Sequence, residues 1–309
     1  MKSTRIGYGF VSGGYALVGI LPIFWCLLAE IDSITVFFQR TVWSALLLGG
    51  VLLYRGELLS SVRSLVSWQQ LGATCMSTFF LGSNWFLYVW AMKHKELFAA
   101  SMAYYICPLM TMAGAALIFR ERFSYQQKVA IAFIIAGVAL PALVGGTLPV
   151  LAVLIAASWS GYILIRRYYE RPALGGIFLE TLLLALILSV LLPIFYDATL
   201  LLPADVDASQ IGLFALSGVV TAVPMIMMIE GMKLIPLKAV GLIQYATPTL
   251  TLVTSVFYFG ASTTPQQLMS LSLVWGGILV FFGQGIRRVV SMLFCRNLSV
   301  LDGVYSRRF

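Results

Sequence analysis

The chain has 309 residues, of which 60% are hydrophobic and 10% are charged. Typical soluble domains carry roughly a quarter charged residues, so this composition excludes an ordinary globular enzyme and predicts an integral membrane protein. The formal net charge of +8 raises the question of a nucleic-acid partner, which the distribution of the positive charges along the chain argues against.

Ten apolar runs are long enough to cross a bilayer as helices, which need about 20 residues each. The runs lie at about 7–29, 34–54, 69–92, 97–119, 128–145, 148–165, 174–196, 210–231, 237–259 and 268–286. The first is too long for the apolar core of a cleavable signal peptide and lacks a small-residue cleavage site behind it, so we expect it to remain as a helix. The predicted fold class is therefore all-α integral membrane, with ten transmembrane helices.

The positive charges collect on one side of this predicted topology. If the N-terminus is cytoplasmic, all 20 Lys and Arg residues except Arg40, Lys93 and Lys95 fall on the cytoplasmic side. This is the positive-inside pattern of membrane proteins. We predict that both termini are cytoplasmic, in the inner membrane if the chain is bacterial. The charge then orients the protein among membrane lipids, and we expect no nucleic-acid partner.

A stretch in the first half of the chain reappears in the second half. Residues 97–119 match residues 237–259 at an offset of 140, with identities at Leu97/Leu237, Ala99/Ala239, Tyr105/Tyr245, Pro108/Pro248, Thr111/Thr251 and Phe119/Phe259. Each half holds five spans, and an odd number inverts the second copy in the membrane. We therefore predict two inverted five-helix repeats, 1–146 and 147–290, followed by a basic cytoplasmic tail, 291–309.

Both copies of this stretch carry a proline near the middle. A proline cannot donate its backbone hydrogen bond and displaces the carbonyl four residues earlier, so Pro108 frees the carbonyl of Tyr104 and Pro248 frees that of Gln244. Secondary transporters recurrently combine inverted repeats with interrupted helices around a substrate site at mid-membrane. We interpret the prolines as hinges beside such a site. Inverted duplications also occur in channels, so the repeat by itself indicates the architecture of the protein and not its activity.

Two charges lie inside predicted spans at equivalent positions, Arg40 and Glu180. Buried charges in spans are costly and usually face an interior or a water-filled cavity. One interpretation is that each lines its half of a pathway or forms an alternating gate; the other is that both reach toward headgroups or cap carbonyls of neighbouring helices. Glu230 lies near the end of the eighth span, where an ion pair with Lys233 is the expected role.

Polar and aromatic side chains gather on the faces of several spans. Tyr104, Tyr105, Gln244 and Tyr245 surround the prolines, and we predict that they form the central substrate contacts. Flanking contacts are predicted at Asn84, Trp85, Tyr88, Trp159 and Tyr162, with Arg40 and Glu180 included as candidate substrate-binding charges. Any single Tyr or Trp of this set could instead be an interfacial anchor or a packing residue.

Seven short motifs carry a family likeness. They are QRTVWS (39–44), SNWFLYVWAM (83–92), SMAYYICPL (101–109), RERF (120–123), LETL (179–182), TAVP (221–224) and IQYATPTL (243–250). They resemble the EamA domains of the drug/metabolite transporter superfamily, and the RarD branch in particular. The resemblance implies alternating access through a central cavity lined by the first, third, fourth, sixth, eighth and ninth helices. It implies a small-molecule substrate, with drug export of the RarD type as one alternative.

Departures from the RarD pattern concern the region beside the proline. Gln39 stands where a histidine is usual, and Ala99, Ala103 and Cys107 replace an acidic, glycine and asparagine pattern. Aromatic faces attract cations, and together with Glu180 they favour a zwitterionic or cationic amphiphile, such as an amino acid or a compound like S-adenosylmethionine. A coupling proton or a counter-substrate is equally compatible with the sequence.

The remaining classes are a membrane enzyme and a channel. An enzyme would need acids or a histidine clustered near the interface, and the loops offer no such group. His94 is the only histidine and the four cysteines show no paired spacing, so neither a conventional zinc site nor a cofactor is expected.

Overall fold

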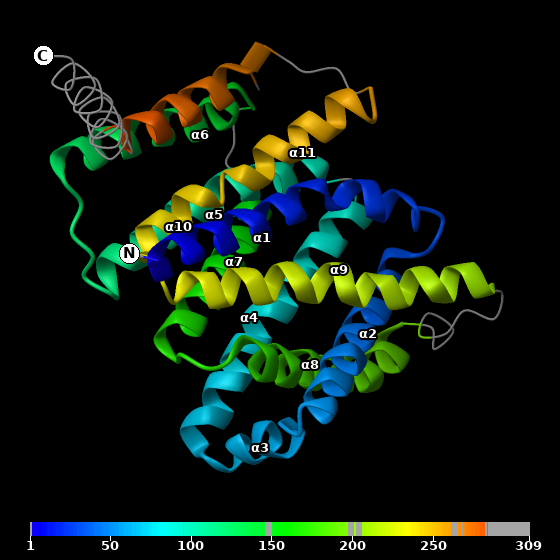
Figure 1. Ribbon diagram of the computed structural model, residues 1–309. Helices are drawn as coiled ribbons and strands as arrows, with labels where there is room; N and C mark the ends of the chain where they lie inside the picture. The colour runs from blue at the N-terminus through cyan, green and yellow to red at the C-terminus, as the bar shows by residue number, and fades with distance from the viewer. Residues whose placement is uncertain are drawn as a thin grey trace, which may run out of the picture. The chain divides into compact units, whose positions relative to one another are not determined.

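The computed structural model describes residues 2–94, 96–145, 150–196, 201, 206–260, 265–266, 268–281 and 283. The regular secondary structure of these residues is helical (Figure 1). The helices are α1 (Lys2–Cys26), α2 (Ser33–Tyr54), α3 (Leu58–Arg63), α4 (Trp68–Lys93), α5 (Leu97–Leu117), α6 (Tyr125–Gly145), α7 (Val150–Tyr168), α8 (Ala173–Phe195), α9 (Ala208–Met232), α10 (Leu237–Ile243) and α11 (Ala246–Phe257), with a further helix at Leu268–Phe281.

Helical residues occupy every one of the ten apolar ranges expected from the sequence, with two differences. The segment between α2 and α4 contains α3 and a 3₁₀ turn, Ser64–Val66, which the hydropathy pattern did not predict. The ninth range is interrupted between α10 and α11. The predicted tail, 291–309, lies outside the described residues.

Six of the described helical segments are long and apolar enough to cross a membrane. They are Ser3–Cys26, Ser33–Tyr54, Val150–Tyr168, Ala173–Phe195, Ala208–Met232 and Leu237–Phe257. Shorter apolar helices lie at Met102–Leu117, Tyr125–Leu140 and Leu268–Phe281. Many of their apolar side chains face outward, as is expected where lipid rather than water is the solvent.

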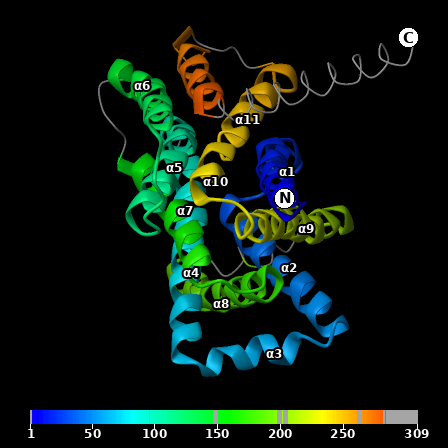
Figure 2. The same ribbon diagram turned by 60° about the vertical axis from the view of Figure 1, so that its left-hand side comes forward.

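The helices form two compact units. The first consists of Met1–Glu121 and Leu148–Ser262 and holds α1 to α5 and α7 to α11. Within it α1 packs between α9 and α11, and α7 packs between α4 and α5, while α2 meets α8 and α5 meets α10 (Figures 1 and 2). The group of α1, α9 and α11 and the group of α7, α4 and α5 are equivalent at the offset of 140. In this relation α1 corresponds to α7, α9 to α4 and α11 to α5.

The second unit contains the described residues of Arg122–Thr147 and Thr263–Phe309, and in it α6 packs against the helix Leu268–Phe281. The packing is reciprocal at two equivalent glycines. A Cβ atom at Gly137 would lie 2.8 Å from the carbonyl oxygen of Ser270, and one at Gly277 would lie 2.7 Å from that of Ala130. The hydroxyl of Ser270 also donates to the carbonyl of Gly137 at 2.7 Å. Small residues thus let the two backbones meet closely.

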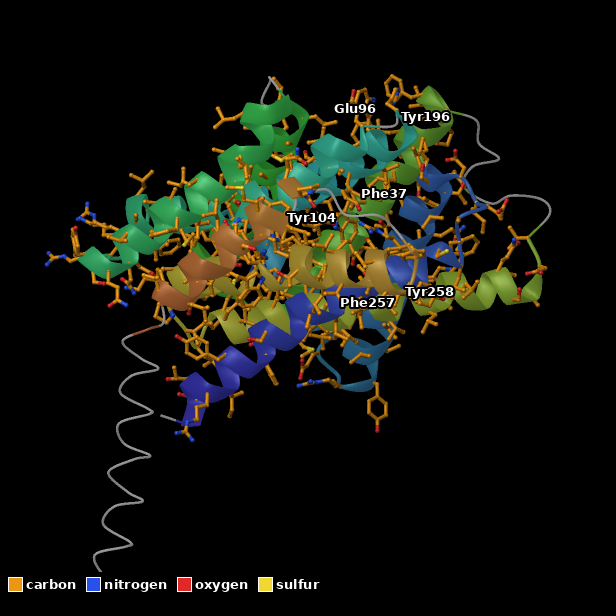
Figure 3. The ribbon with its side chains drawn as sticks, turned by 90° about the horizontal axis from the view of Figure 1, so that it is seen from above. Phe37, Glu96, Tyr104, Tyr196, Phe257 and Tyr258 are labelled. Carbon is orange, nitrogen blue, oxygen red and sulfur yellow. The ribbon has the colours of Figure 1, made fainter. Side chains whose placement is uncertain are left out.

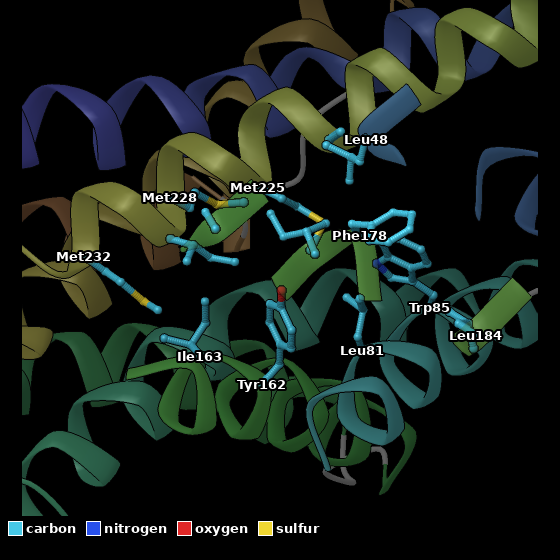
Figure 4. Packing of buried hydrophobic residues seen from close by; sticks show 14 of the residues in the cluster. Leu48, Leu81, Trp85, Tyr162, Ile163, Phe178, Leu184, Met225, Met228 and Met232 are labelled. Carbon is cyan, nitrogen blue, oxygen red and sulfur yellow. The ribbon is translucent and has the colours of Figure 1, made fainter. Parts of the chain in front are cut away.

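The buried apolar core of the first unit joins helices from both halves of the chain. Figure 4 shows Met225, Met228 and Met232 of α9 opposite Tyr162 and Ile163 of α7. On α2, a Cβ atom at Gly49 would lie 2.9 Å from the Phe178 ring of α8. This core fixes the helices that surround the candidate site.

Candidate functional site

The two equivalent prolines have different structural effects. Helix α5 runs unbroken through Pro108, whereas the equivalent segment breaks at Gln244 and Tyr245, between α10 and α11. Pro248 is the third residue of α11, in the first turn, where a missing N–H costs little. The carbonyl of Gln244, which we expected to be free, accepts a hydrogen bond from the backbone N–H of Thr247 at 3.1 Å. The turn between α10 and α11 therefore satisfies the carbonyl of Gln244.

The break at Gln244 is held by a chain of buried hydrogen bonds. Gln244 Nε2 donates to Thr111 Oγ1 at 3.2 Å, and Thr111 Oγ1 lies 3.3 Å from Ser160 Oγ, to which it can donate. Ser160 in turn donates to the carbonyl of Cys107 at 3.0 Å. The chain links the α10–α11 break to α5 and α7, and it fixes the side chain of Gln244.

Beside this break lies a cavity of about 180 Å³ within the first unit. It is lined by side chains from α1, α2, α4, α5, α7, α9 and α11 and by Gln244. These elements include the six that the family resemblance implies, and α2 joins them through Arg40. The lining is mainly aromatic and aliphatic, with a few polar groups, which is typical of small-molecule sites.

Seven of the predicted contact residues line this cavity, and the others do not. The lining residues are Arg40, Asn84, Trp85, Tyr88, Tyr104, Trp159 and Gln244. The structure does not bring Tyr105, Tyr245, Tyr162 or Glu180 to the cavity, nor either of Pro108 and Pro248. Figure 3 marks Tyr104 and Phe37 within the helical array, seen from above. The cavity therefore lies on one side of the proline region.

Sequence reasoning missed several lining residues. These are Tyr15 and Trp25 on α1, Thr221, Met225 and Met228 on α9, and Thr247 and Thr251 on α11. The hydroxyl of Thr221 is buried without a hydrogen-bond partner in the described part of the chain, and the buried hydroxyl of Tyr15 lies beside Trp159 and Gln244. Two signals were present: Tyr15 is a polar aromatic residue in the middle of an apolar run, and Thr221 opens the TAVP motif.

Asn84 ties α4 to α7 at the edge of the cavity. Its Nδ2 donates to the carbonyl of Ile155 at 2.9 Å and to Ser158 Oγ at 3.2 Å. Ser158 itself donates to the same carbonyl at 2.8 Å. Next to it, the rings of Tyr88 and Tyr104 pack edge to face with centroids 6.0 Å apart. These contacts hold the aromatic wall in place.

Arg40 brings its guanidinium among aromatic rings. Its Cζ lies 3.9 Å from the ring centroid of Trp85, 5.7 Å from that of Trp25 and 5.9 Å from that of Phe37. These distances are in the range of cation–π attraction. Arg40 Nε is buried and has no hydrogen-bond partner among the described residues. Arg40 therefore lies in the lining of the cavity, with its guanidinium among aromatic rings.

Glu180 has a different environment, which neither expectation for it anticipated. Its Oε2 accepts a hydrogen bond from Tyr162 at 2.9 Å, and its Oε1 lies 3.2 Å from Arg166 Nη1 and 3.9 Å from Arg171 Nη2. The side chains of Glu180 and Arg166 are 0% and 1% exposed. The carboxylate neither lines the cavity nor reaches the surface, because two arginines and a tyrosine hold it in the protein interior.

Arg171, in the turn between α7 and α8, completes this buried cluster. It donates to Thr74 Oγ1 of α4 at 2.7 Å. Burial lowers the pKa of its guanidinium, and the neighbouring positive charge of Arg166 lowers that pKa further. The cluster of Tyr162, Arg166, Arg171 and Glu180 therefore joins α4, α7 and α8.

Glu230 forms the expected ion pair with Lys233, Nζ to Oε2 at 2.8 Å. Its other oxygen accepts the backbone N–H of Ala173 at 2.6 Å, at the first turn of α8. A carboxylate in this position satisfies one of the unpaired donors of a helix start. The role is structural, at a helix boundary.

The comparison with known proteins now decides the family. The model of the EamA-like transporter family matches the chain twice, at residues 5–142 and 147–283. The chain belongs to the EamA-like transporter family. This EamA-like protein is a multi-pass membrane protein of a transporter family, as its long apolar helices also indicate.

Curated relatives place this EamA-like chain in the RarD-like branch. It is 29% identical to the uncharacterized transporter YojE of Bacillus subtilis, over 90% of this chain and 94% of that protein. It is 26% identical to Protein RarD of Escherichia coli, over 99% of this chain and 98% of that protein. A solved crystal structure, 21% identical, superimposes with a TM-score of 0.68 over 90% of this chain and 96% of its own, which shows the shared fold.

Proposed function

We propose that the protein is a secondary transporter that moves a small organic metabolite across the membrane by alternating access. The observation that carries this proposal is the cavity lined by both halves of the chain, beside a helix break. Transporters of inverted-repeat design bind their cargo at such a repeat interface, where discontinuous helices supply polar groups.

The proposed architecture is ten transmembrane helices in two inverted five-helix repeats. It is supported by the helix starts, because α2, α4 and α5 begin at 33, 68 and 97, and α8, α9 and α10 begin at 173, 208 and 237. It is also supported by the reciprocal contacts of Gly137 and Gly277. Under this proposal both termini are cytoplasmic, in the inner membrane of a bacterial cell, because the cations then obey the positive-inside rule.

The size of the cavity favours a small cargo. The volume of the cavity is about 180 Å³. Pockets for drug-sized ligands usually measure about 300–1,000 Å³. One relative in Pseudomonas aeruginosa bears the printed name chloramphenicol-sensitive protein RarD, at 24% identity. Drug export is the second candidate, and the cavity volume supports it less well.

The lining also favours one of the two kinds of cargo expected from the sequence, cationic and zwitterionic. A cationic cargo was expected partly because Glu180 was placed at the site, and that carboxylate is engaged by Arg166 and Arg171. A zwitterionic metabolite keeps its support, since Arg40 offers a positive charge and the tyrosines and Gln244 offer polar groups. We therefore favour a zwitterion of amino-acid size as the first cargo to test.

The test is uptake of labelled amino acids by proteoliposomes that contain the purified protein. We expect saturable uptake that Tyr104→Ala combined with Gln244→Ala strongly reduces, because both residues line the cavity. Tyr54→Ala is the matched control, since Tyr54 is 93% exposed and is not among the lining residues. Unchanged transport kinetics in the double variant would show that the cargo binds elsewhere.

The same vesicles separate the two proposed modes of coupling. An imposed proton gradient should accelerate uptake if a proton is the coupling ion. Preloading with unlabelled cargo should accelerate it if the protein exchanges one molecule for another. Uptake that neither treatment changes would contradict coupled transport by either route.

A further inference from the structure

We propose that Arg40 is an anion-binding residue of the cavity and that the cargo carries a carboxylate or a comparable organic anion next to an apolar or aromatic body. This inference rests on the proposed function and names the chemical class of its cargo.

Arg40 is the one charged side chain in the described lining of the cavity. Nearby or equivalent acids are engaged elsewhere: Glu180 by Arg166 and Arg171, Glu230 by Lys233 and the N–H of Ala173. Glu121 accepts from the backbone N–H groups of Leu237 and Lys238. The lining therefore carries a positive charge with no carboxylate to neutralise it.

In the described part of the chain, this positive charge lies among aromatic rings, with Tyr88 and Tyr104 as its electrostatic neighbours. A guanidinium has five N–H donors, and the rings of Trp85, Trp25 and Phe37 attract its charge without accepting strong hydrogen bonds. Arg40 Nε has no partner in the described part of the chain. An arginine left in this state within a membrane protein is costly and points to a functional partner.

A carboxylate supplies what the arginine lacks. Its two oxygens accept a pair of parallel N–H donors from a guanidinium, which gives a strong and directional contact. The packing of Arg40 against Trp85 restricts the guanidinium, so less side-chain freedom remains to be lost when the anion binds. A cation at the same place would meet an unneutralised positive charge.

The rest of the lining suits an apolar body with a few polar contacts. Trp85, Trp159, Tyr88 and Tyr104 present aromatic surface to the cavity. Two further lining residues, on α1 and α9, bring buried hydroxyls: that of Tyr15 lies beside Trp159 and Gln244, and that of Thr221 has no partner in the described part of the chain. The cavity thus combines one cationic group with aromatic walls, which selects against small hydrophilic cations.

The test measures binding of three compounds with one carbon frame and different charge. They are 3-phenylpropionate, 3-phenylpropanol and 3-phenylpropylamine, titrated by calorimetry into the full-length protein purified in detergent. We expect the carboxylate to bind at least about tenfold more tightly than the alcohol, in keeping with one charge-assisted contact. The amine should bind more weakly than the alcohol. Equal affinities for the three, tighter binding of the amine, or no binding of the carboxylate at millimolar concentration would overturn the proposal.

Variants assign the preference to Arg40. Arg40→Gln should remove the preference for the carboxylate, and Arg40→Lys should keep part of it, since a lysine retains the charge and loses the two-pronged contact. Arg55→Gln, at the exposed end of the same helix, is the control and should bind like the wild type. Monodisperse gel filtration establishes that each variant folds, and a variant of Arg40 that folds and keeps the full preference contradicts the assignment.

The binding test fails separately from the proposed function. If labelled amino acids are transported and the double variant at Tyr104 and Gln244 is impaired, the transporter proposal stands whatever the three probes do. If the probes bind with the expected order and no cargo moves, the anion site stands and the transport proposal does not.

Discussion

The hydroxyl of Tyr245 donates a hydrogen bond to the backbone carbonyl of Tyr105 at 3.1 Å. The two residues occupy the same place in the two halves of the chain, 140 positions apart. Tyr245 is 1% exposed and lies in the break between α10 and α11, whereas Tyr105 lies within the continuous helix α5. The two equivalent tyrosines therefore have different roles, because the side chain of Tyr245 bonds to the backbone of Tyr105.

Tyr245→Phe tests this bond directly. We expect a loss of roughly 1 kcal/mol, the usual net contribution of one intramolecular hydrogen bond, because the ring still fills its place. The melting temperature of the purified protein should fall by a few degrees. Tyr258→Phe, at a 62% exposed position, should leave it unchanged. Equal melting temperatures for Tyr245→Phe and the wild type would mean that the bond contributes nothing.

Glu180→Gln tests the buried cluster. The substitution leaves Arg166 and Arg171 without their negative partner in the interior, and breaking a buried ion pair from one side typically costs about 3–5 kcal/mol. We expect a sharp loss of folded protein in detergent, measured by fluorescence gel filtration. Glu57→Gln removes an exposed pair with Arg55 and should cost about 0–1 kcal/mol. A folded yield for Glu180→Gln equal to that of Glu57→Gln would refute a structural role for the cluster.

The reciprocal glycines of the second unit give a prediction about symmetry. Gly137→Ala and Gly277→Ala each place a methyl group against a backbone carbonyl, so each should destabilise by about 1–3 kcal/mol, as overpacking usually does. Gly276→Ala meets no atom within 4 Å and should be neutral or slightly stabilising, because alanine favours helix. Thermal melting of the three variants checks the contrast, which a similar shift for Gly276→Ala and Gly277→Ala would eliminate.

The two prolines are expected to differ in function as they differ in structure. Pro108→Ala adds a backbone N–H inside a continuous helix, where it can bond to the carbonyl of Tyr104 and stiffen α5. We expect a higher melting temperature and slower transport in the vesicle assay. Pro248→Ala acts in the first turn of α11 and should change both quantities less. Faster or unchanged transport by Pro108→Ala would argue against a hinge there.

Much of the helical framework could be predicted from hydropathy, and the reasons are physical. A run of about 20 apolar residues forms a helix in lipid, because lipid offers no hydrogen-bond partners and every backbone group must be bonded within the chain. The offset of 140 then relates the helices in pairs. The sequence predicted a hinge at Pro248 that would free the carbonyl of Gln244. The helix does break at Gln244, but Pro248 lies in the first turn of the next helix, where its missing N–H costs little, and the carbonyl of Gln244 is bonded.

The candidate site was less predictable because charge pairing depends on distant residues. Arg40 and Glu180 occupy equivalent positions in the sequence, but among the described residues only Glu180 has ion-pair partners, Arg166 and Arg171. No periodicity reports that Tyr162 turns its hydroxyl to Glu180 while Trp159, three residues earlier, lines the cavity. The lining residues Tyr15 and Thr221 were missed because the sequence does not distinguish them from other polar residues of the same runs, such as Ser12 and Ser217.

The helix starts of the two halves follow the same spacing. From α2 to α4 the interval is 35 residues, from α4 to α5 it is 29, and both intervals recur from α8 to α9 and from α9 to α10. The side chains differ at most equivalent positions, including Arg40 in one half and Glu180 in the other. The intervals between helix starts are nevertheless equal. The two halves therefore agree more closely in the spacing of their helices than in the chemistry of the residues that those helices carry.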